Sequence, residues 1–156
     1  MQLPGLGSIF DMDKPRVLFL CTGNSCRSQM AEAFLRLYGG ENFEVYSAGL
    51  DPKPIHPITI QVMEEIGYDM SSHRSKTLDE FLGKVHFSYL ITVCSNAEER
   101  CPTFPGMGQR LHWPFEDPAA FVGTPEETIA KFREIRDQIA NRVRDWLETM
   151  MGDDAD

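Results

Sequence analysis

An apolar run that breaks into a polar turn and then into a helical pattern occupies residues 17–34, VLFLCTGNSCRSQMAEAF. We interpret this stretch as a strand, a loop and a helix. Within the loop, five residues separate Cys21 from Arg27, and Ser28 follows directly. A loop of this length that runs into a helix N-terminus points successive backbone N–H groups into one concavity, which suits a tetrahedral oxyanion. Arg27 can bind the same anion through two parallel hydrogen bonds.

Cys21 stands at the mouth of this predicted anion cradle. The helix N-terminus and the Arg27 guanidinium both favour a thiolate over a thiol, so the sulfur would be a nucleophile aimed at the anion. The alternative is a strand-end cysteine that packs as a small apolar side chain beside a solvated arginine. The apolar strand, Gly23, Asn24, the Arg-Ser pair and the helix occur together, and this combination favours the cradle.

Length and charge limit the remaining possibilities. A chain of 156 residues suits one domain, and a formal net charge of −9 argues against a nucleic-acid or anionic-membrane partner. A local positive site must therefore attract an anionic substrate. The first fifteen residues contain no basic region and no sustained apolar stretch, so we expect neither a secretory signal nor a membrane anchor and place the protein in the cytoplasm. A reducing cytosol favours catalytic or metal-binding cysteines over structural disulfides.

Strand and helix patterns alternate along the chain, which predicts an α/β fold with a parallel sheet and helices on both faces. We expect a loose extension over residues 1–15, a single catalytic domain over 16–150 and a disordered acidic tail over 151–156. Capping boxes are predicted at Thr77 with Glu80 and at Thr124 with Glu127. The proline-rich loop 50–57 follows the second strand and is placed to wall the site. The expected strands cover 16–21, 43–47, 87–93 and 109–113; the expected helices cover 27–38, 57–67, 77–83 and the apolar-striped segment that Thr124 caps.

Cys94 and Cys101 flank the helical segment SNAEER. Cys94 directly follows the third strand, and it comes within reach of Cys21 if that strand neighbours the first. Seven residues of helix would separate Cys94 from Cys101 by about 10 Å. A disulfide needs Cα atoms closer than about 7 Å, so the segment must unwind if the two ever bond. The alternatives are buried structural cysteines or a zinc site, although the C-x4-C and C-x6-C spacings do not match structural zinc ligands.

Asp117 lies in a loop after the fourth strand, at the same predicted edge of the sheet. A carboxyl group beside a leaving oxyanion can act as a general acid. The alternative is an ordinary turn residue before Pro118. The four histidines show no spacing that indicates a metal, and we expect neither a metal nor another cofactor.

These features together resemble the low-molecular-weight protein tyrosine phosphatase superfamily and, within it, the arsenate reductases that couple to thioredoxin. The likeness covers about residues 17–147, and its most specific parts are CTGNSCRSQMAE, VYSAG, CSNAEERCP and WPFEDPA. The resemblance implies a three-layer, flavodoxin-like fold with a four-stranded parallel sheet. It also implies a nucleophile at Cys21, a hydroxyl at Ser28 that supports the thiolate, and a general acid at Asp117. Substrate binding is then expected from the loop residues Thr22, Gly23, Asn24, Ser25, Cys26 and Arg27.

Within this superfamily, two features favour a reductase over a phosphatase. Phosphatases usually carry proline after the Arg-Ser pair and an aromatic residue after Asp-Pro, whereas this chain has Gln29 and Ala119. Phosphatases also do not need a second and third cysteine, Cys94 and Cys101. Cys26 matches the superfamily, and we expect it to be structural.

The resemblance implies a thiol relay. Cys21 attacks arsenate, Cys94 attacks Cys21 and expels arsenite, and Cys101 attacks Cys94 and moves the disulfide to Cys94–Cys101. Thioredoxin then reduces this pair. Relatives use glutathione with glutaredoxin, or mycothiol, and the spacing of Cys94 and Cys101 favours thioredoxin.

Two other functions remain open at this point. One is a phosphotyrosine protein phosphatase, which needs only Cys21, Arg27 and Asp117. The other is a redox or oxyanion sensor that signals through the same disulfide. In each case we expect a monomer with no nucleic-acid or membrane partner.

Overall fold

The computed structural model describes residues 14–101 and 107–155, with side chains as far as Met151. Four parallel strands form one sheet in the order β2-β1-β3-β4: β1 Arg16–Cys21, β2 Glu44–Gly49, β3 Phe87–Thr92 and β4 Met107–His112. This order is the doubly wound, flavodoxin-like one. Cys21 pairs with Gly49 on one side, and Leu20 pairs with Thr92 on the other. The predicted parallel sheet is confirmed, with the first and third strands adjacent.

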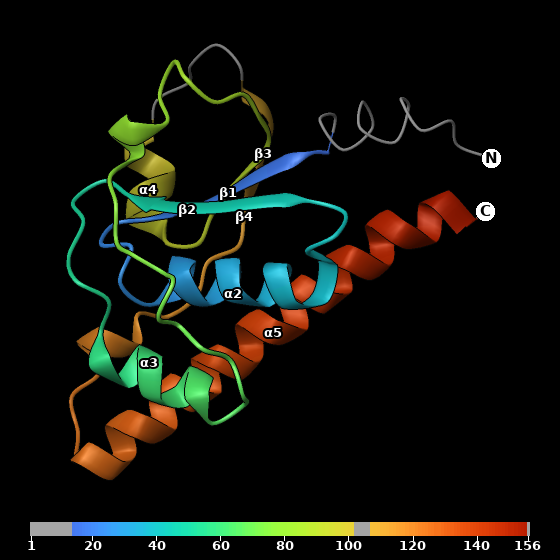
Figure 1. Cartoon of the computed structure of the whole chain (residues 1–156). Coiled ribbons are helices and arrows are strands. Elements are labelled where there is room, and N and C mark those ends of the chain that lie inside the picture. Colours follow the sequence, from blue (N-terminus) through green and yellow to red (C-terminus); the bar gives the residue numbers. More distant parts are fainter. Residues whose placement is uncertain (1–13, 102–106, 156) are drawn as a thin grey trace.

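Helices lie on both sides of this sheet (Figure 1). The helices α2, Arg27–Gly39, and α5, Pro125–Ala155, pack against each other below the sheet in this view, and α3, Pro57–Glu64, packs on α5. The short helix α4, Ser95–Arg100, contacts β1 and β3 from the other side. The three-layer arrangement that the sequence predicted is therefore present.

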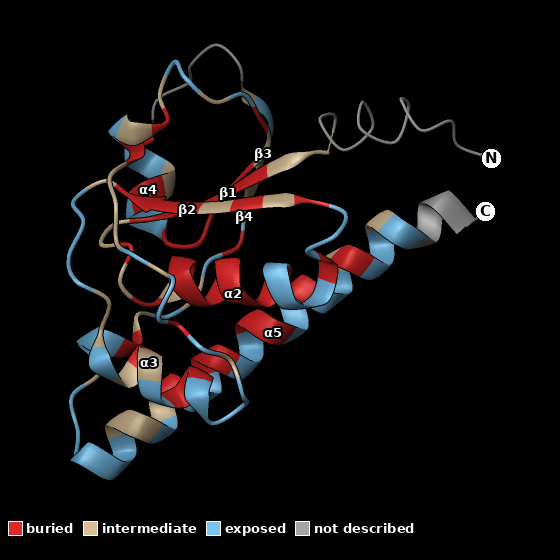
Figure 2. Ribbon diagram, in the orientation of Figure 1, coloured by how far each residue is buried: buried red, intermediate tan, exposed pale blue. Residues whose placement is uncertain are grey.

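The centre of the core is β1, whose residues 17–21 are buried because sheet neighbours flank the strand and helices cover it (Figure 2). Below the sheet, an aromatic chain joins the strands to α5: the Phe19 and Trp113 ring centroids lie 5.9 Å apart, and those of Trp113 and Trp146 5.8 Å apart. The apolar stripe of α5 is buried at Phe132, Ile135, Ile139 and Val143. This stripe is core, as its spacing predicted.

One of the two predicted capping boxes is present. At α5, the Thr124 N–H donates to Glu127 Oε1 at 2.9 Å, and the Glu127 N–H donates to Thr124 Oγ1 at 3.1 Å. The box at Thr77 and the helix 77–83 were wrong: this segment forms only a 3-10 turn, η1, Leu78–Glu80. The Glu80 carboxylate instead receives two hydrogen bonds of 2.8 Å from Arg74, because a guanidinium fork is a stronger partner than one backbone N–H.

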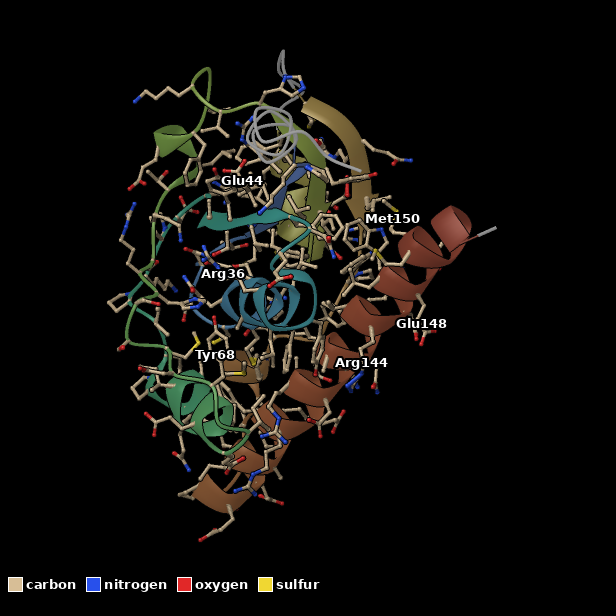
Figure 3. The ribbon with its side chains drawn as sticks, turned by 45° about the vertical axis from the view of Figure 1, so that its right-hand side comes forward. Arg36, Glu44, Tyr68, Arg144, Glu148 and Met150 are labelled. Atoms are coloured by element: carbon tan, nitrogen blue, oxygen red, sulfur yellow. The ribbon has the colours of Figure 1, made fainter. Side chains whose placement is uncertain are left out.

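Several element ends also differ from the sequence prediction. β2 continues to Gly49, and α3 ends at Glu64 before Gly67, which adopts the left-handed conformation with φ +83°. The helix α5 continues through Ala155, where we expected a disordered tail from residue 151. On its last turns, Met150 lies on the side facing the sheet and Glu148 on the opposite side (Figure 3). Of the expected N-terminal extension, residues 1–13 lie outside the described residues. No helix in the described part of the chain is long and apolar enough to cross a membrane.

Candidate active site

The loop between β1 and α2 borders a cavity of about 490 Å³ at the carboxyl edge of the sheet. Four of the side chains that the sequence placed here arrive from different elements: Cys21 from the end of β1, Arg27 from the start of α2, Cys94 from the residues after β3, and Asp117 from the cap of the 3-10 turn η2, Pro118–Ala120. The cavity is lined by Cys21, Thr22, Gly23, Ser25, Cys26, Arg27, Lys53, Cys94, Ser95, Asn96, Phe115, Asp117 and Ala119.

Two hydrogen bonds meet the sulfur of Cys21. The Asn24 N–H donates to Cys21 Sγ at 3.1 Å, and Ser28 Oγ lies 2.8 Å from the same sulfur. Ser28 Oγ itself accepts a hydrogen bond of 2.8 Å from Asn24 Nδ2, so its own hydrogen is available to the sulfur. Donors of this kind stabilise a thiolate, which is the nucleophilic form of cysteine. The structure thus places Ser28 where its predicted role requires it.

Asn24 holds the loop from beneath. It is fully buried and adopts the left-handed conformation with φ +50°, which asparagine tolerates better than most residues. Its Nδ2 also donates to Ser47 Oγ at 3.0 Å, and its Oδ1 accepts from Gln29 Nε2 and from the Lys76 N–H, each at 3.0 Å. Asn24 is not among the residues that line the cavity and its side chain supports the loop; the expected role of Asn24 in substrate binding stays a prediction.

A second layer of buried polar groups supports Asn24. Ser47 Oγ donates to Glu32 Oε1, and Lys76 Nζ lies 3.8 Å from the same carboxylate oxygen. Burial lowers the pKa of Lys76, and the Glu32 charge opposes that shift. A hydrogen bond of 2.9 Å also joins Gln29 Oε1 and His73 Nδ1. The loop is therefore bound to β2 and to the segment 73–76 through side chains.

Gly49 allows the loop to lie close to β2. A Cβ atom at Gly49 would lie 2.7 Å from the Thr22 carbonyl oxygen and 2.9 Å from the Asn24 nitrogen. Both are backbone atoms, so neither can swing aside as a flexible side chain can. Only glycine fits here without displacing the anion cradle.

Arg27 and Asp117 lie next to each other in the wall of the cavity. Arg27 Nη1 donates to the Phe115 carbonyl at 3.0 Å, and Nη2 lies 3.7 Å from Asp117 Oδ2. Asp117 Oδ1 accepts from the Ala119 N–H at 3.0 Å, so the residue also makes the ordinary turn contact that was its alternative interpretation. The turn fixes one carboxylate oxygen and leaves the other beside Arg27.

Cys94 also lines the cavity and is the N-cap residue of α4. Its sulfur accepts from the Ala97 N–H at 3.4 Å and lies 3.4 Å from Thr22 Oγ1. Asn96 Nδ2 donates to Thr22 Oγ1 at 2.8 Å, which leaves the threonine hydrogen for the Cys94 sulfur. Cys21 and Cys94 therefore line one cavity, as the strand order predicted.

The other two cysteines, Cys26 and Cys101, are also buried, and of the two only Cys26 lines the cavity. Cys101 caps the far end of α4, is buried, and is not among the cavity-lining residues. Burial raises the pKa of its thiol, although the charge of Arg110 opposes this. Burial likewise raises the pKa of Cys26, against hydrogen bonds from Thr59 and Ser25.

Several contributors to the site were missed from the sequence. The proline-rich loop was expected as a wall, and Lys53 is the side chain with which it lines the cavity. Asn96 and the support formed by Glu32, Ser47 and Lys76 gave no signal, since their partners are distant in sequence. Among the described residues, no group of three histidine, cysteine, aspartate or glutamate side chains could hold a metal ion.

Comparison with known proteins identifies the class. The low molecular weight phosphotyrosine protein phosphatase family matches residues 16–155, and this chain belongs to that family. Its sequence is 45% identical over 139 residues to an arsenate reductase of Halalkalibacterium halodurans, covering 88% of this chain and 99% of that protein.

Solved structures give the same relationship. An arsenate reductase in the phosphate-binding state is similar with a TM-score of 0.72 and 31% identity, over 86% of this chain and 98% of that one. A thioredoxin-dependent arsenate reductase from Corynebacterium glutamicum has a TM-score of 0.66 and 30% identity, over 88% of this chain and 62% of that one.

The close approach at Gly49 gives a testable prediction. Gly49→Ala should lower the free energy of unfolding by about 1–3 kcal/mol, because the added methyl group displaces loop backbone. Gly23→Ala is the matched control, since the nearest heavy atom to a Cβ there is 3.7 Å away. Urea denaturation of both variants measures the difference, and equal loss in the two would contradict the steric argument.

His73 should make stability depend on pH. Burial lowers its pKa from the ordinary value of 6.5, against the raising effect of Glu32. As pH falls below that value, the unfolded chain takes up a proton before the native histidine does, so the free energy of unfolding falls. His73→Asn should lose less stability than the wild type between about pH 7 and pH 5. Denaturant titrations across this range measure both slopes, and parallel slopes would contradict the assignment.

Proposed function

We propose that this chain is an arsenate reductase, which reduces arsenate to arsenite through Cys21, Cys94 and Cys101 and is regenerated by thioredoxin. The observation that carries the proposal is that Cys94 lines the same cavity as Cys21, with Cys101 at the other end of α4. A second thiol beside the nucleophile gives electrons a route that hydrolysis of a phosphate ester does not use. The arsenate reductases similar to this chain support the same conclusion.

The first step is binding and attack. Arsenate, a tetrahedral oxyanion, occupies the concavity of loop amides at the N-terminus of α2, beside the Arg27 guanidinium. The Cys21 thiolate, held by donors from Asn24 and Ser28, forms a bond from sulfur to arsenic(V). Asp117, beside Arg27, helps one arsenic oxygen leave as water.

The second step transfers the electrons. The Cys94 sulfur, as a thiolate, bonds to Cys21 Sγ, and the arsenic–sulfur bond breaks. Its electron pair stays on arsenic, which leaves as arsenite with arsenic in the +3 state. The two cysteine sulfurs have together lost two electrons and form the Cys21–Cys94 disulfide.

The third step frees the nucleophile. Cys101 attacks Cys94 Sγ, and Cys21 leaves as a thiolate, so the disulfide moves without further oxidation. Because α4 separates Cys94 from Cys101, this step requires the helix to unwind. The thioredoxin dithiol then supplies two electrons to the Cys94–Cys101 disulfide. The thioredoxin dependence named for the Corynebacterium glutamicum neighbour supports this donor.

A phosphotyrosine protein phosphatase is the second candidate, because Cys21, Arg27 and Asp117 are sufficient for phosphate-ester hydrolysis and share one cavity. Gln29 and Ala119, which differ from the usual phosphatase residues, favour the reductase. Gln29 ties Asn24 to His73, and Ala119 leaves a small side chain at the cavity wall.

The proposal extends to the setting in which the enzyme works. We place it in the cytoplasm as a monomer with one catalytic domain over residues 16–150. Thioredoxin and arsenate are its partners.

The test is arsenate-dependent NADPH oxidation with thioredoxin and thioredoxin reductase. The wild type should turn over, whereas Cys21→Ser, Cys94→Ser and Cys101→Ser should each fall to the background rate, because each removes one sulfur of the relay. Hydrolysis of an aryl phosphate is the internal control: Cys94→Ser and Cys101→Ser should retain the wild-type rate, and Cys21→Ser should lose it. Repeated arsenate turnover by Cys94→Ser would contradict the relay, and efficient hydrolysis with no arsenate turnover by the wild type would favour the phosphatase.

A further inference from the structure

Arg110 binds the C-terminal half of α4 at three points. Its Nε donates to Glu98 Oε1 at 2.8 Å, its Nη2 donates to the Glu98 carbonyl oxygen, and its Nη1 donates to the Cys101 carbonyl at 3.2 Å. Arg110 belongs to β4, where it is in register with Leu90 of β3. The guanidinium of a β4 residue therefore donates hydrogen bonds to one side chain and two backbone carbonyl groups of the helical segment. We call this contact the Arg110 clasp.

Glu98 is held in its charged form for this contact. Thr92 Oγ1 donates to Glu98 Oε2 at 2.7 Å, and His112 Nδ1 lies 3.4 Å from the same oxygen. Burial of the carboxyl group opposes ionisation, but the hydrogen bond from Thr92 and the charge of Arg110 outweigh it and lower the pKa of Glu98. The partners of Glu98 come from β3 and β4, so the sheet holds the helix from two strands.

Other contacts hold α4 at its two ends, including a hydrogen bond of 2.8 Å from Asn96 Nδ2 to Thr22 Oγ1 near the N-terminus. Arg100 pairs with Asp51 at 2.8 Å, but the two side chains are 45% and 61% exposed, and pairs this exposed add little stability. At the N-terminal end, Cys94 Sγ caps the helix. A sulfur in a disulfide is a poor hydrogen-bond acceptor, so oxidation of Cys94 weakens that cap. In the C-terminal half of α4, among the described residues, the Arg110 clasp is then the main side-chain contact that keeps the segment helical.

The clasp and the third step of the relay are incompatible. Bringing Cys101 to Cys94 unwinds the segment between them, which moves the Glu98 and Cys101 carbonyl groups. The Arg110 backbone is fixed in the sheet, so its guanidinium cannot keep contact with both carbonyl groups as they move apart from their helical positions. Its hydrogen bonds to those two carbonyl groups must break before the Cys94–Cys101 disulfide forms.

We propose that Arg110 is a positioning residue that stabilises the helical form of α4 against the form with a Cys94–Cys101 disulfide, and so controls the last internal step of the relay. This proposal rests on the relay proposed above. The step itself is thiol–disulfide exchange: the Cys94–Cys101 bond forms, the Cys21–Cys94 bond breaks, and Cys21 leaves as a thiolate. The clasp changes the equilibrium of the pair and leaves its chemistry as it is.

The experiment is a redox titration of the full chain in buffers of reduced and oxidised dithiothreitol. Peptide mass spectrometry after alkylation gives the share of Cys94–Cys101 disulfide. Arg110→Met should shift the equilibrium toward the disulfide by about 10-fold, because hydrogen bonds to charged groups that favour the helical form are lost. This shift makes the potential about 30 mV more negative. Arg110→Lys keeps the charge without the planar fork, so its potential should lie between those of the wild type and Arg110→Met.

Two further variants complete the design. Arg133→Met removes an arginine bound to Glu65, far from α4, and should leave the potential unchanged. Glu98→Gln removes the charge from the other partner of the clasp and should shift the potential in the same direction as Arg110→Met. If Arg110→Met does not fold, Glu98→Gln tests the role of the clasp by itself. If Arg110 served only to stabilise the fold, Arg110→Met would change the denaturation midpoint and leave the potential of the Cys94–Cys101 pair unchanged.

The outcomes separate this inference from the proposed function. An unchanged or less negative potential in folded Arg110→Met and in Glu98→Gln overturns the clasp and leaves the relay standing. A wild type that reduces arsenate without ever forming the Cys94–Cys101 disulfide overturns the relay and the clasp together.

Discussion

The site depends on the buried side chain of Asn24 beneath the β1–α2 loop. Its amide group donates to Ser28 and Ser47 and accepts from Gln29 and the Lys76 backbone, while its own backbone N–H donates to Cys21 Sγ. A single residue in the left-handed conformation thus fixes the curvature of the loop, aims the Ser28 hydroxyl at the nucleophile and ties both to β2. Because buried hydrogen bonds are costly to leave unmade, removing one partner leaves the others unsatisfied. The geometry of the anion cradle therefore depends on contacts well below its surface.

The same cavity can serve two reactions, and the neighbours of Cys21 determine which one follows. Binding of a tetrahedral anion requires only the loop and Arg27. Cys94 adds a second sulfur that lines the same cavity, and Cys101 adds a third at the other end of α4. In this relay, reduction is therefore coupled to the unwinding of the six-residue helix α4. The helix must be stable enough to form with Cys94 as its N-cap and must still be able to unwind. In our account the Arg110 clasp sets that balance.

Much of this site could be predicted from the sequence because its signals are local. The loop motif lies within a few residues of Cys21, and the alternation of strands and helices placed Cys94 at the right sheet edge. The failures involve competition or distance. Glu80 satisfied the pattern of a capping box, but Arg74 is the stronger partner. Glu32 and Ser47 are fifteen residues apart, and Arg110 lies twelve residues from Glu98. No period or spacing indicates such pairs, since only the folded sheet brings them together.

The central claim is that Cys94 removes the oxidising equivalent from Cys21, and one trapping measurement tests it most directly. Reduced Cys101→Ser, freed of excess reductant, is mixed with one equivalent of arsenate, quenched with acid, alkylated and analysed by peptide mass spectrometry. The account predicts one arsenite released per chain, a disulfide between Cys21 and Cys94, and an alkylated Cys26. Arsenite released while Cys94 remains alkylatable, or a disulfide from Cys21 to Cys26, would contradict it.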